Sequence, residues 1–313
     1  MSHLHRAIAT LAVLLLSFSA TAQTTDRFRI TLLGTGTPRP IMQRFGPSIL
    51  VEAGPEVLLF DVGRGSLQRL EQVGVPYARL TGVFLTHLHS DHVVGLPDLW
   101  LSGWLVSRRT APLEVWGPAG TEEMVARLRE AYKFDLQIRV EDDHANPDGG
   151  RLLATDIEEG VVLSRNGVTV KAFLVDHSPV KPALGYRIDY RGHSAVLSGD
   201  TRKSGNLIKH AMGVDVLIHE VAAADKDELA KSSLTRSVLA HHTTAPEAAA
   251  VFRETAPKLA VYSHIVLRGA ATSDDVLRET RRTYDGKVVM GSDLMTIDVF
   301  SQKVDAMSVV TSR

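Results

Sequence analysis

The chain has 313 residues, of which 44% are hydrophobic and 23% are charged, a composition typical of a globular protein. Its 35 basic and 36 acidic residues give a formal net charge of -1, which argues against a strongly basic nucleic-acid-binding surface overall. The chain has no cysteine, which excludes disulfides and thiolate metal ligands. Any metal ion would therefore be bound by imidazole and carboxylate groups, a ligand set that suits zinc, iron or manganese.

The first 22 residues have the pattern of a cleaved signal peptide. Arg6 supplies a positive charge, residues 8–16 form a short apolar run, and Ala20-Thr21-Ala22 provides small residues for cleavage before Gln23. The run is too short for a permanent transmembrane helix. We therefore expect a periplasmic or secreted protein that has no contact with a membrane after cleavage. A buried N-terminal helix and an uncleaved anchor are the two alternatives.

The first half of the mature chain begins with β-structure and continues with alternating helices and strands. Apolar runs and Gly/Pro breaks predict strands over residues 28–33, 48–52, 57–61 and 83–86, the second and third of which form a hairpin. Helical spacing predicts a helix over residues 64–73. Two more helices are predicted, one after the histidine-rich segment at residues 87–92 and one after residues 117–121. Residues 141–160 are acidic and rich in Gly, Asn and Asp, and we expect a loop there.

The second half repeats this alternation. It predicts helices over residues 203–212, 246–255 and 273–283, and strands over residues 168–175, 185–190, 194–198, 215–218, 259–262, 287–290 and 294–299. No stretch resembles an interdomain linker. Two sheets flanked by helices, in one domain over residues 23–313, are the natural packing of such a pattern.

The strongest functional signal is the segment Thr86-His87-Leu88-His89-Ser90-Asp91-His92, which directly follows a predicted strand. On an extended segment His87 and His89 point to the same side, so that one metal ion can bind both. Asp91 and His92 follow where the chain turns into a helix, and they can face a second metal ion. A polar loop formed by chance is the structural alternative.

This segment resembles the signature of the metallo-β-lactamase superfamily. The runs LLGTGTPRP at 32–40, RFGPS at 44–48 and LLFDVGRGS at 58–66 resemble the ribonuclease Z and arylsulfatase branch in particular. The resemblance implies an αββα sandwich of two mixed sheets flanked by helices. It also implies a metal-dependent hydrolase with two Zn²⁺ ions, for which Mn²⁺ or Fe²⁺ are alternatives.

The resemblance extends to ligands later in the chain. His177, in Val175-Asp176-His177, would complete the first metal site with His87 and His89. Asp200, in Ser198-Gly199-Asp200-Thr201, would bridge both metal ions. His264 would join Asp91 and His92 on the second. Each residue alone is ordinary in a structural role, and the assignment depends on their occurring together in the family's order.

Two further motifs resemble catalytic segments of the same branch. His219-Glu220 and His242-Thr243-Thr244 are similar to the family's His-Glu-Ala-Thr and His-Ser-Thr motifs, although the first reads His-Glu-Val-Ala here. The resemblance implies that Glu220 orients His242, which donates a proton to the leaving group, and that Asp91 accepts a proton from a metal-bridging hydroxide. The sequence leaves open whether His241 or His242 faces the site.

A proton donor suits an ester with a poor leaving group, and we expect a small anionic ester, either a phosphodiester or an aryl sulfate. Only 23 positions separate His177 from Asp200, which leaves no room for the arm that ribonuclease Z enzymes use to grip tRNA. Export would also separate the protein from tRNA, and we therefore expect no tRNA partner. A lactone or β-lactam hydrolase and a non-catalytic metal-binding protein are the alternatives, and a homodimer is left open.

Three basic residues are candidate contacts for the anion, namely Arg39, Arg44 and Lys181. Solvated surface charge is the alternative for each. Trp100 and Trp104 lie four residues apart on the helix after the metal-binding segment, so they share one face. Packing in the core or against another subunit is favoured for them over an aromatic wall of the substrate pocket.

The signal-peptide interpretation predicts the N-terminus of the mature protein. N-terminal sequencing of the exported protein should begin near Gln23, because signal peptidases cleave after small residues such as those at 20 and 22. Recovery of intact Met1 in the soluble cytoplasmic fraction would contradict the prediction.

Overall fold

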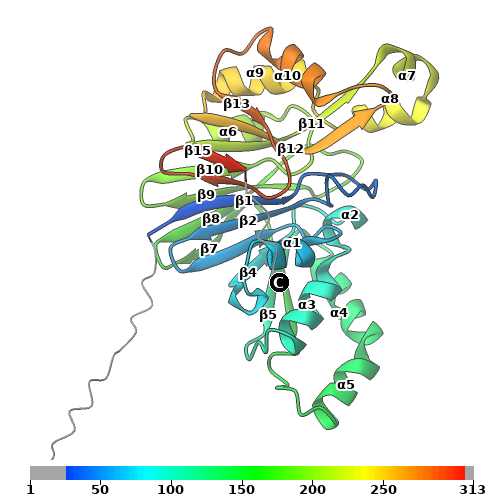
Figure 1. The fold of residues 1–313 in the computed structure, drawn as a ribbon, viewed down its shortest axis with the longest axis vertical. Helices are drawn as coiled ribbons and strands as arrows, with labels where there is room; N and C mark the ends of the chain where they lie inside the picture. The colour runs from blue at the N-terminus through cyan, green and yellow to red at the C-terminus, as the bar shows by residue number, and fades with distance from the viewer. Residues whose placement is uncertain (1–25, 307–313) are drawn as a thin grey trace, which may run out of the picture.

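The computed structural model describes residues 26–306. Two β-sheets pack face to face, and helices cover the outer face of each sheet (Figure 1). This architecture confirms the αββα sandwich expected from the sequence. The signal-peptide interpretation concerns residues outside the described range. Within that range no helix is long and apolar enough to cross a membrane.

The first sheet has eight strands and mixes antiparallel with parallel pairing. Their order across the sheet is β15 (Lys303–Ala306), β14 (Met295–Asp298), β1 (Phe28–Gly34), β2 (Ser48–Ala53), β3 (Glu56–Phe60), β4 (Gly82–Phe84), β5 (Leu113–Gly117) and β6 (Leu152–Asp156). A buried apolar layer joins the sheet to its covering helices. The helices on this side are α1 (Ser66–Gln72), α2 (Ser90–Val93), α3 (Leu96–Leu105), α4 (Thr121–Ala131) and α5 (Lys133–Glu141), with a 3₁₀ turn at Tyr77–Arg79.

The second sheet has seven strands and is also mixed. Their order is β13 (Val288–Met290), β12 (Leu259–Arg268), β11 (Val216–Ala224), β10 (His193–Leu197), β9 (Leu184–Tyr190), β8 (Val168–Leu174) and β7 (Gly160–Arg165). Its outer face packs against α6 (Gly205–Ala211), α9 (Ala245–Thr255) and α10 (Ser273–Arg281). Two short helices, α7 (Lys226–Lys231) and α8 (Ser233–Leu239), extend away from the sandwich between β11 and α9 (Figure 1).

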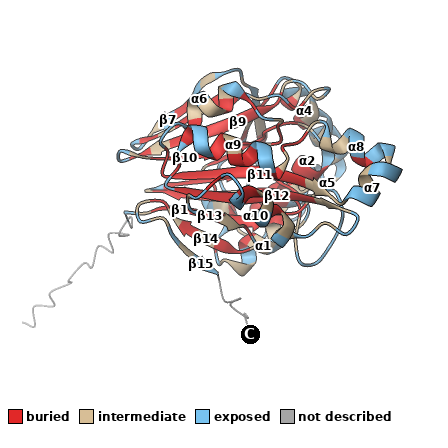
Figure 2. Cartoon of the chain, turned by 90° about the horizontal axis from the view of Figure 1, so that it is seen from above, coloured by how far each residue is buried: buried red, intermediate tan, exposed pale blue. Residues whose placement is uncertain are grey.

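The inner faces of the two sheets form the main core, and buried strands fill the centre of the molecule (Figure 2). Phe60 and Phe84 stack with ring centroids 5.1 Å apart, and Tyr186 from the second sheet packs against both. The Tyr186 hydroxyl donates a hydrogen bond of 2.6 Å to the carbonyl of Leu85. This bond ties the second sheet to the segment that leads into the histidine cluster.

The prediction of a loop over residues 141–160 is partly wrong. An irregular segment is present, but α5 ends at Glu141 and β6 occupies Leu152–Asp156. β6 forms the edge of the first sheet by parallel pairing with β5, a long-range contact that local composition does not reveal. Trp100 and Trp104 are both buried in the core, and their indole N–H groups donate to backbone carbonyls, which confirms the packing interpretation.

Candidate metal centre

The candidate ligands meet at one edge of the sandwich because the strands that precede or carry them lead to that edge. His87 follows β4, His177 follows β8, Asp200 follows β10, and His264 lies within β12. Of the described residues, His87, His89, His177 and Asp200 offer ligand atoms within 4.8 Å of one another, and so do Asp91, His92 and His264. These are the two groups that the resemblance implies, with Asp200 close to both.

The first ligand segment begins as extended chain and then turns into α2. The Nε2 atom of His87 and the Nδ1 atom of His89 are 3.0 Å apart, on the side of the chain that faces His177. Asp91 and His92 are placed by the short helix α2, which turns them toward the second group. The change from extended chain to helix thus places His87 and His89 in the first group and Asp91 and His92 in the second.

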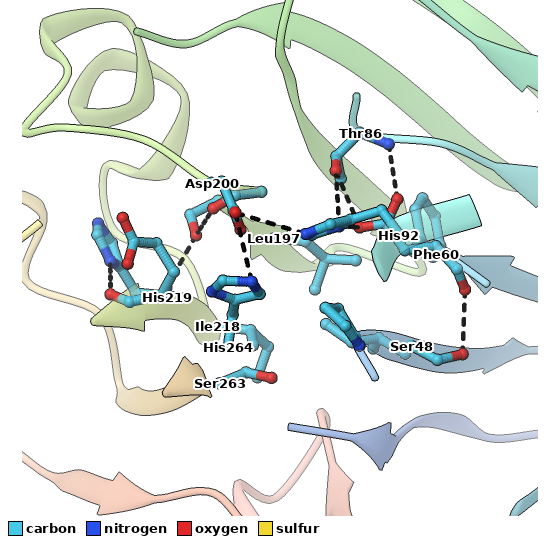
Figure 3. A pocket seen from close by; sticks show the side chains of 16 residues that line it. Ser48, Phe60, Thr86, His92, Leu197, Asp200, Ile218, His219, Ser263 and His264 are labelled. Carbon is cyan, nitrogen blue, oxygen red and sulfur yellow. Dashed lines mark hydrogen bonds and ion pairs between the residues drawn. The ribbon is translucent and has the colours of Figure 1, made fainter. Parts of the chain in front are cut away.

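Asp200 lies at the centre of the cluster. Its Oδ2 atom is within 4 Å of four imidazole nitrogens, each an Nε2 atom: His264 at 3.3 Å, His92 at 3.4 Å, His87 at 3.9 Å and His177 at 3.9 Å. Figure 3 shows the Asp200 carboxylate directed between His92 and His264. A single carboxylate therefore faces both groups, as a bridging ligand must.

His264 owes its orientation to a β-bulge. The pairing of β11 with β12 passes from Glu220–Ser263 to Val221–Ile265, so His264 has no partner residue on β11. Its φ angle is 42°, in the left-handed region that few residues other than glycine adopt. Bulges of this kind re-aim a side chain next to a functional site, and this one turns His264 toward Asp91 and Asp200.

Asp61 was not among the predicted site residues, although it lies in the LLFDVGRGS run. Its carboxylate accepts hydrogen bonds from the Thr86 backbone N–H at 2.8 Å and from the Thr86 hydroxyl at 2.9 Å. It also pairs with Nδ1 of His92 at 2.7 Å, which leaves Nε2 directed at Asp200. Carboxylates that hold the second nitrogen of a ligand imidazole in this way orient metal-binding histidines.

The buried polar atoms of the cluster test whether metal ions fit. Within residues 26–306 several of them have no hydrogen-bond partner, namely Nε2 of His92, His177 and His264, Oδ2 of Asp91 and Oδ1 of Asp200. Buried polar atoms without partners are rare and costly, by about 1–3 kcal/mol each. Their concentration at one point, on the donor types that zinc prefers, fits a metal-binding site.

The ionisation of the cluster also matches the forms that bind metals. Burial, together with the neighbouring His92, lowers the pKa of His87 well below its usual range, and burial likewise lowers the pKa of His177. Burial alone would raise the pKa of Asp200, but His264 and His92 outweigh it and hold that pKa well below its usual range. His92 differs, because its burial is outweighed by Asp200 and Asp61, which raise its pKa well above its usual range. Neutral imidazoles, as at His87 and His177, and an ionised carboxylate, as at Asp200, are the forms that bind divalent ions.

Glu220 and His242 form an ion pair beside the cluster. Nδ1 of His242 is 3.3 Å from Oε1 of Glu220, which also accepts a hydrogen bond of 2.8 Å from the Thr243 N–H. Burial would lower the pKa of His242, but Glu220 outweighs it and raises the pKa to about 9. The His242 ring stacks on His264 at 5.5 Å and belongs to a ligand-like group with Asp200. His242, and not His241, thus faces the centre.

His219 and His241 contact residues of the site, namely Glu220 and His177. His219 is fully buried, donates from Nδ1 to the Glu220 carbonyl at 2.6 Å, and packs against Phe252. The carbonyl of His241 accepts a hydrogen bond of 2.9 Å from Nδ1 of His177, which leaves Nε2 of His177 directed at Asp200.

The three candidate anion-binding residues lie in different surroundings. Arg44 is half-buried, and its guanidinium donates to the Thr35 hydroxyl and the Gly291 carbonyl, each at 2.7 Å. Those bonds hold the loop that follows β1. Arg39 is exposed and lines a cavity beyond α2 that Arg44 also lines, whereas Lys181 is exposed and lines a surface hollow with Asp176. The structure therefore does not bring the three together.

Comparison with known proteins places this architecture in a family. Residues 48–265 match the model of a beta-lactamase superfamily domain. Ribonuclease Z of Mycobacterium marinum is 37% identical over 277 residues, which cover 87% of this chain and 99% of that protein. Ribonuclease Z of Mycobacterium avium is 38% identical over 86% of this chain and 98% of that protein.

Solved structures agree with the sequence relatives. The short form of human tRNase Z is 25% identical with a TM-score of 0.63, over 87% of this chain and 99% of that one. The metallo-β-lactamase fold protein YhfI of Bacillus subtilis has a TM-score of 0.69 at 21% identity, over 87% of this chain and 99% of that one, and shares the fold.

Two expectations from the sequence are wrong: a small anionic ester as the substrate, and the exclusion of tRNA as a partner. The relatives are named ribonuclease Z and tRNase Z. The short interval from His177 to Asp200, which folds as a loop, β9 and β10, was one argument against tRNA, beside the predicted export. This chain nevertheless aligns with 99% of a ribonuclease Z, so the short interval does not exclude that function. The chain belongs to the ribonuclease Z branch of the metallo-β-lactamase superfamily and is a metal-dependent hydrolase.

Proposed function

We propose that this chain is a zinc-dependent phosphodiesterase that cleaves RNA, with tRNA as the substrate class. The observation that carries the proposal is the Glu220–His242 pair, 3.3 Å apart, beside the metal-binding cluster. A ribose oxygen is a poor leaving group that benefits from a proton donor, and the pair supplies one. The relatives are named ribonuclease Z and tRNase Z, which supports RNA as the substrate that contains the cleaved phosphodiester bond.

Two zinc ions are proposed for the cluster. His87, His89 and His177 would hold the first, Asp91, His92 and His264 the second, and Asp200 would contact both; the two groups of neighbouring ligand atoms support this division. When bound, the ions acidify water and neutralise the negative charge that develops on the phosphate oxygens. Mn²⁺ and Fe²⁺ suit the same nitrogen and oxygen ligands.

The protein's own groups would move the protons. Asp91, whose buried Oδ2 atom lies 3.5 Å from Nε2 of His264, is proposed to accept a proton from the attacking water. His242 is proposed to donate a proton from Nε2 to the leaving ribose oxygen, because its Nδ1 faces Glu220. Donation of this kind contributes about 10²–10⁴-fold to rate.

A second cavity supports the binding of a chain of nucleotides and not of an isolated phosphate. It has a volume of about 380 Å³ and is bordered by Val94, which directly follows α2, and by the loop over residues 38–46. Its exposed arginines, Arg39 and Arg64, accompany exposed apolar side chains, including Met42 at 77% exposure. Asp98 is the acidic residue in its lining. Guanidinium and apolar groups together suit the phosphate and base of a nucleotide.

The metal assignment predicts the metal content of the protein. Protein purified without chelator should contain close to two metal ions per chain, mostly zinc, by elemental analysis. His89→Ala should lose the first ion, and Asp61→Asn should weaken metal affinity by about 10–100-fold because His92 loses its orienting carboxylate. His144→Asn, at an exposed histidine, serves as the control and should keep both ions. One ion per chain after zinc supplementation would rule out the dinuclear model.

The RNA proposal predicts cleavage of a tRNA precursor by the zinc-loaded protein and no turnover of p-nitrophenyl sulfate or a cephalosporin. Binding to a labelled RNA oligonucleotide should weaken in Arg64→Ala, and the slope of log affinity against log salt should fall by about 0.7, the value for one lost phosphate contact on a single strand. Met42→Ser should weaken binding without changing that slope, because it removes an apolar contact. Sulfate ester turnover with intact precursor RNA would refute the proposal.

The proton-donor role predicts a dependence on the leaving group. His242→Ala should keep both metal ions and should slow phosphodiesters with alkyl leaving groups at least about 10-fold more than those with p-nitrophenolate. The reason is that a nitrophenolate departs without protonation, whereas an alkoxide does not. Equal slowing of both substrates at full metal occupancy would assign His242 to substrate positioning instead, and metal loss would make it a ligand.

A further inference from the structure

The segment that carries His242 returns from an excursion of the chain and depends on contacts from other loops. α7 and α8 lie between β11 and this segment and extend away from the sandwich (Figure 1). Residues 240–243 are then fastened by several bonds: Ala240 to Arg202, His241 to His177, and Thr243 to both Glu220 and Thr201. The position of His242 therefore depends on hydrogen bonds between residues 240–243 and these neighbouring residues.

Arg202 makes the contact at the start of this segment and also reaches the loop that carries His177. Its Nε donates to the carbonyl of Ala240, and its Nη2 donates to the carbonyl of Ser178 at 3.0 Å. Its Nη1 lies 3.3 Å from the carboxylate of Asp176. One planar guanidinium thus joins the His177 loop to the His242 segment, a geometry that a single ammonium group cannot reproduce.

The two residues before Arg202 contact the metal-binding cluster and the His242 segment. Asp200 faces the four imidazoles of the cluster, and the carbonyl of Thr201 accepts a hydrogen bond of 2.6 Å from the Thr243 hydroxyl. The Thr201 N–H donates to Glu220 at 3.3 Å. Three consecutive residues after β10 therefore connect the proposed bridging ligand with the segment of the proposed proton donor.

We propose that Arg202 is a positioning residue for proton donation by His242, an inference that rests on the proposed function. A donor acts only within hydrogen-bond reach of the leaving oxygen, so a small displacement of its segment is costly. Arg202 fixes that segment at the point where the excursion through α7 and α8 rejoins the sandwich. Direct binding of substrate phosphate is the less suitable role, since Nε, Nη1 and Nη2 are all engaged with protein groups.

Hydrogen–deuterium exchange tests the positioning step without reference to activity. In zinc-loaded Arg202→Ala, backbone exchange in the peptide that covers residues 238–244 should rise by about 10-fold or more, because a local anchor is lost. Arg253→Ala is the matched control, since Arg253 donates a hydrogen bond of 3.1 Å to the Thr283 carbonyl on another surface. It should leave exchange in residues 238–244 unchanged. Unchanged exchange in Arg202→Ala would overturn the inference.

Leaving-group dependence tests the consequence for chemistry. Arg202→Ala should slow an alkyl phosphodiester about 10-fold more than a p-nitrophenyl phosphodiester, and it should add no further loss in a His242→Ala background, because both changes remove the same proton donation. Arg202→Lys keeps the charge beside Asp176 but not the Ala240 bond, so it should restore folding stability while the leaving-group defect remains.

The outcomes separate this inference from the proposed function. Equal slowing of both diesters, additivity with His242→Ala, or loss of a zinc ion in Arg202→Ala would assign Arg202 to general structure or to the His177 loop and would overturn its positioning role. If the parent protein cleaves no phosphodiester at all, the proposed function fails. The role in proton donation then fails with it, while the exchange measurement still decides whether Arg202 fixes the segment.

Discussion

The structure depends on a buried carboxylate that is surrounded by imidazoles. Asp200 is almost inaccessible to solvent, and four histidine nitrogens lie within 4 Å of its Oδ2 atom. Removing an ionised carboxylate from water costs several kcal/mol unless positive charge compensates it. His264 and His92 supply part of that charge, and divalent ions held by the cluster would supply it with the imidazoles in their neutral form. The convergence of strand ends, the turn at α2 and the bulge at His264 all serve to build this arrangement.

A second layer of contacts determines where the ligands point. Asp61 binds Nδ1 of His92, and the His241 carbonyl binds Nδ1 of His177, so that in both rings Nε2 is left for the centre. The second of these contacts has a further effect, because it comes from the residue next to His242. The geometry of a proposed ligand and that of the proposed proton donor are thus not independent. The His242 segment and the His177 loop share this hydrogen bond, and Arg202 joins the same two segments.

The sequence predicts those parts of the site that are local. The cluster from His87 to His92 spans six residues, so its meaning could be read from spacing alone, and the later ligands could be found through a family's order. Asp61 and Arg202 could not be assigned roles, because their partners lie 24 to 38 positions away and meet them only through packing. Arg44 has contacts that the sequence could not show, because its guanidinium donates to Thr35 and Gly291. Its role as an anion contact stays a prediction. The edge strand β6 was missed for the same reason as Asp61.

The substrate expectation was wrong because none of its arguments described the surface that would contact RNA. Those arguments were the net charge near zero, the short His177–Asp200 interval and the predicted export. The net charge, however, gives only the sum over all residues and not their distribution. Arg39 and Arg64 line one cavity, in which Asp98 is the acidic residue. The chemistry at phosphorus is the same for a small diester and for a polymer, so the metal cluster itself does not choose between them. Under the proposed function, that choice would fall to the surface beyond α2, where the arginines and apolar side chains of one cavity would contact further nucleotides.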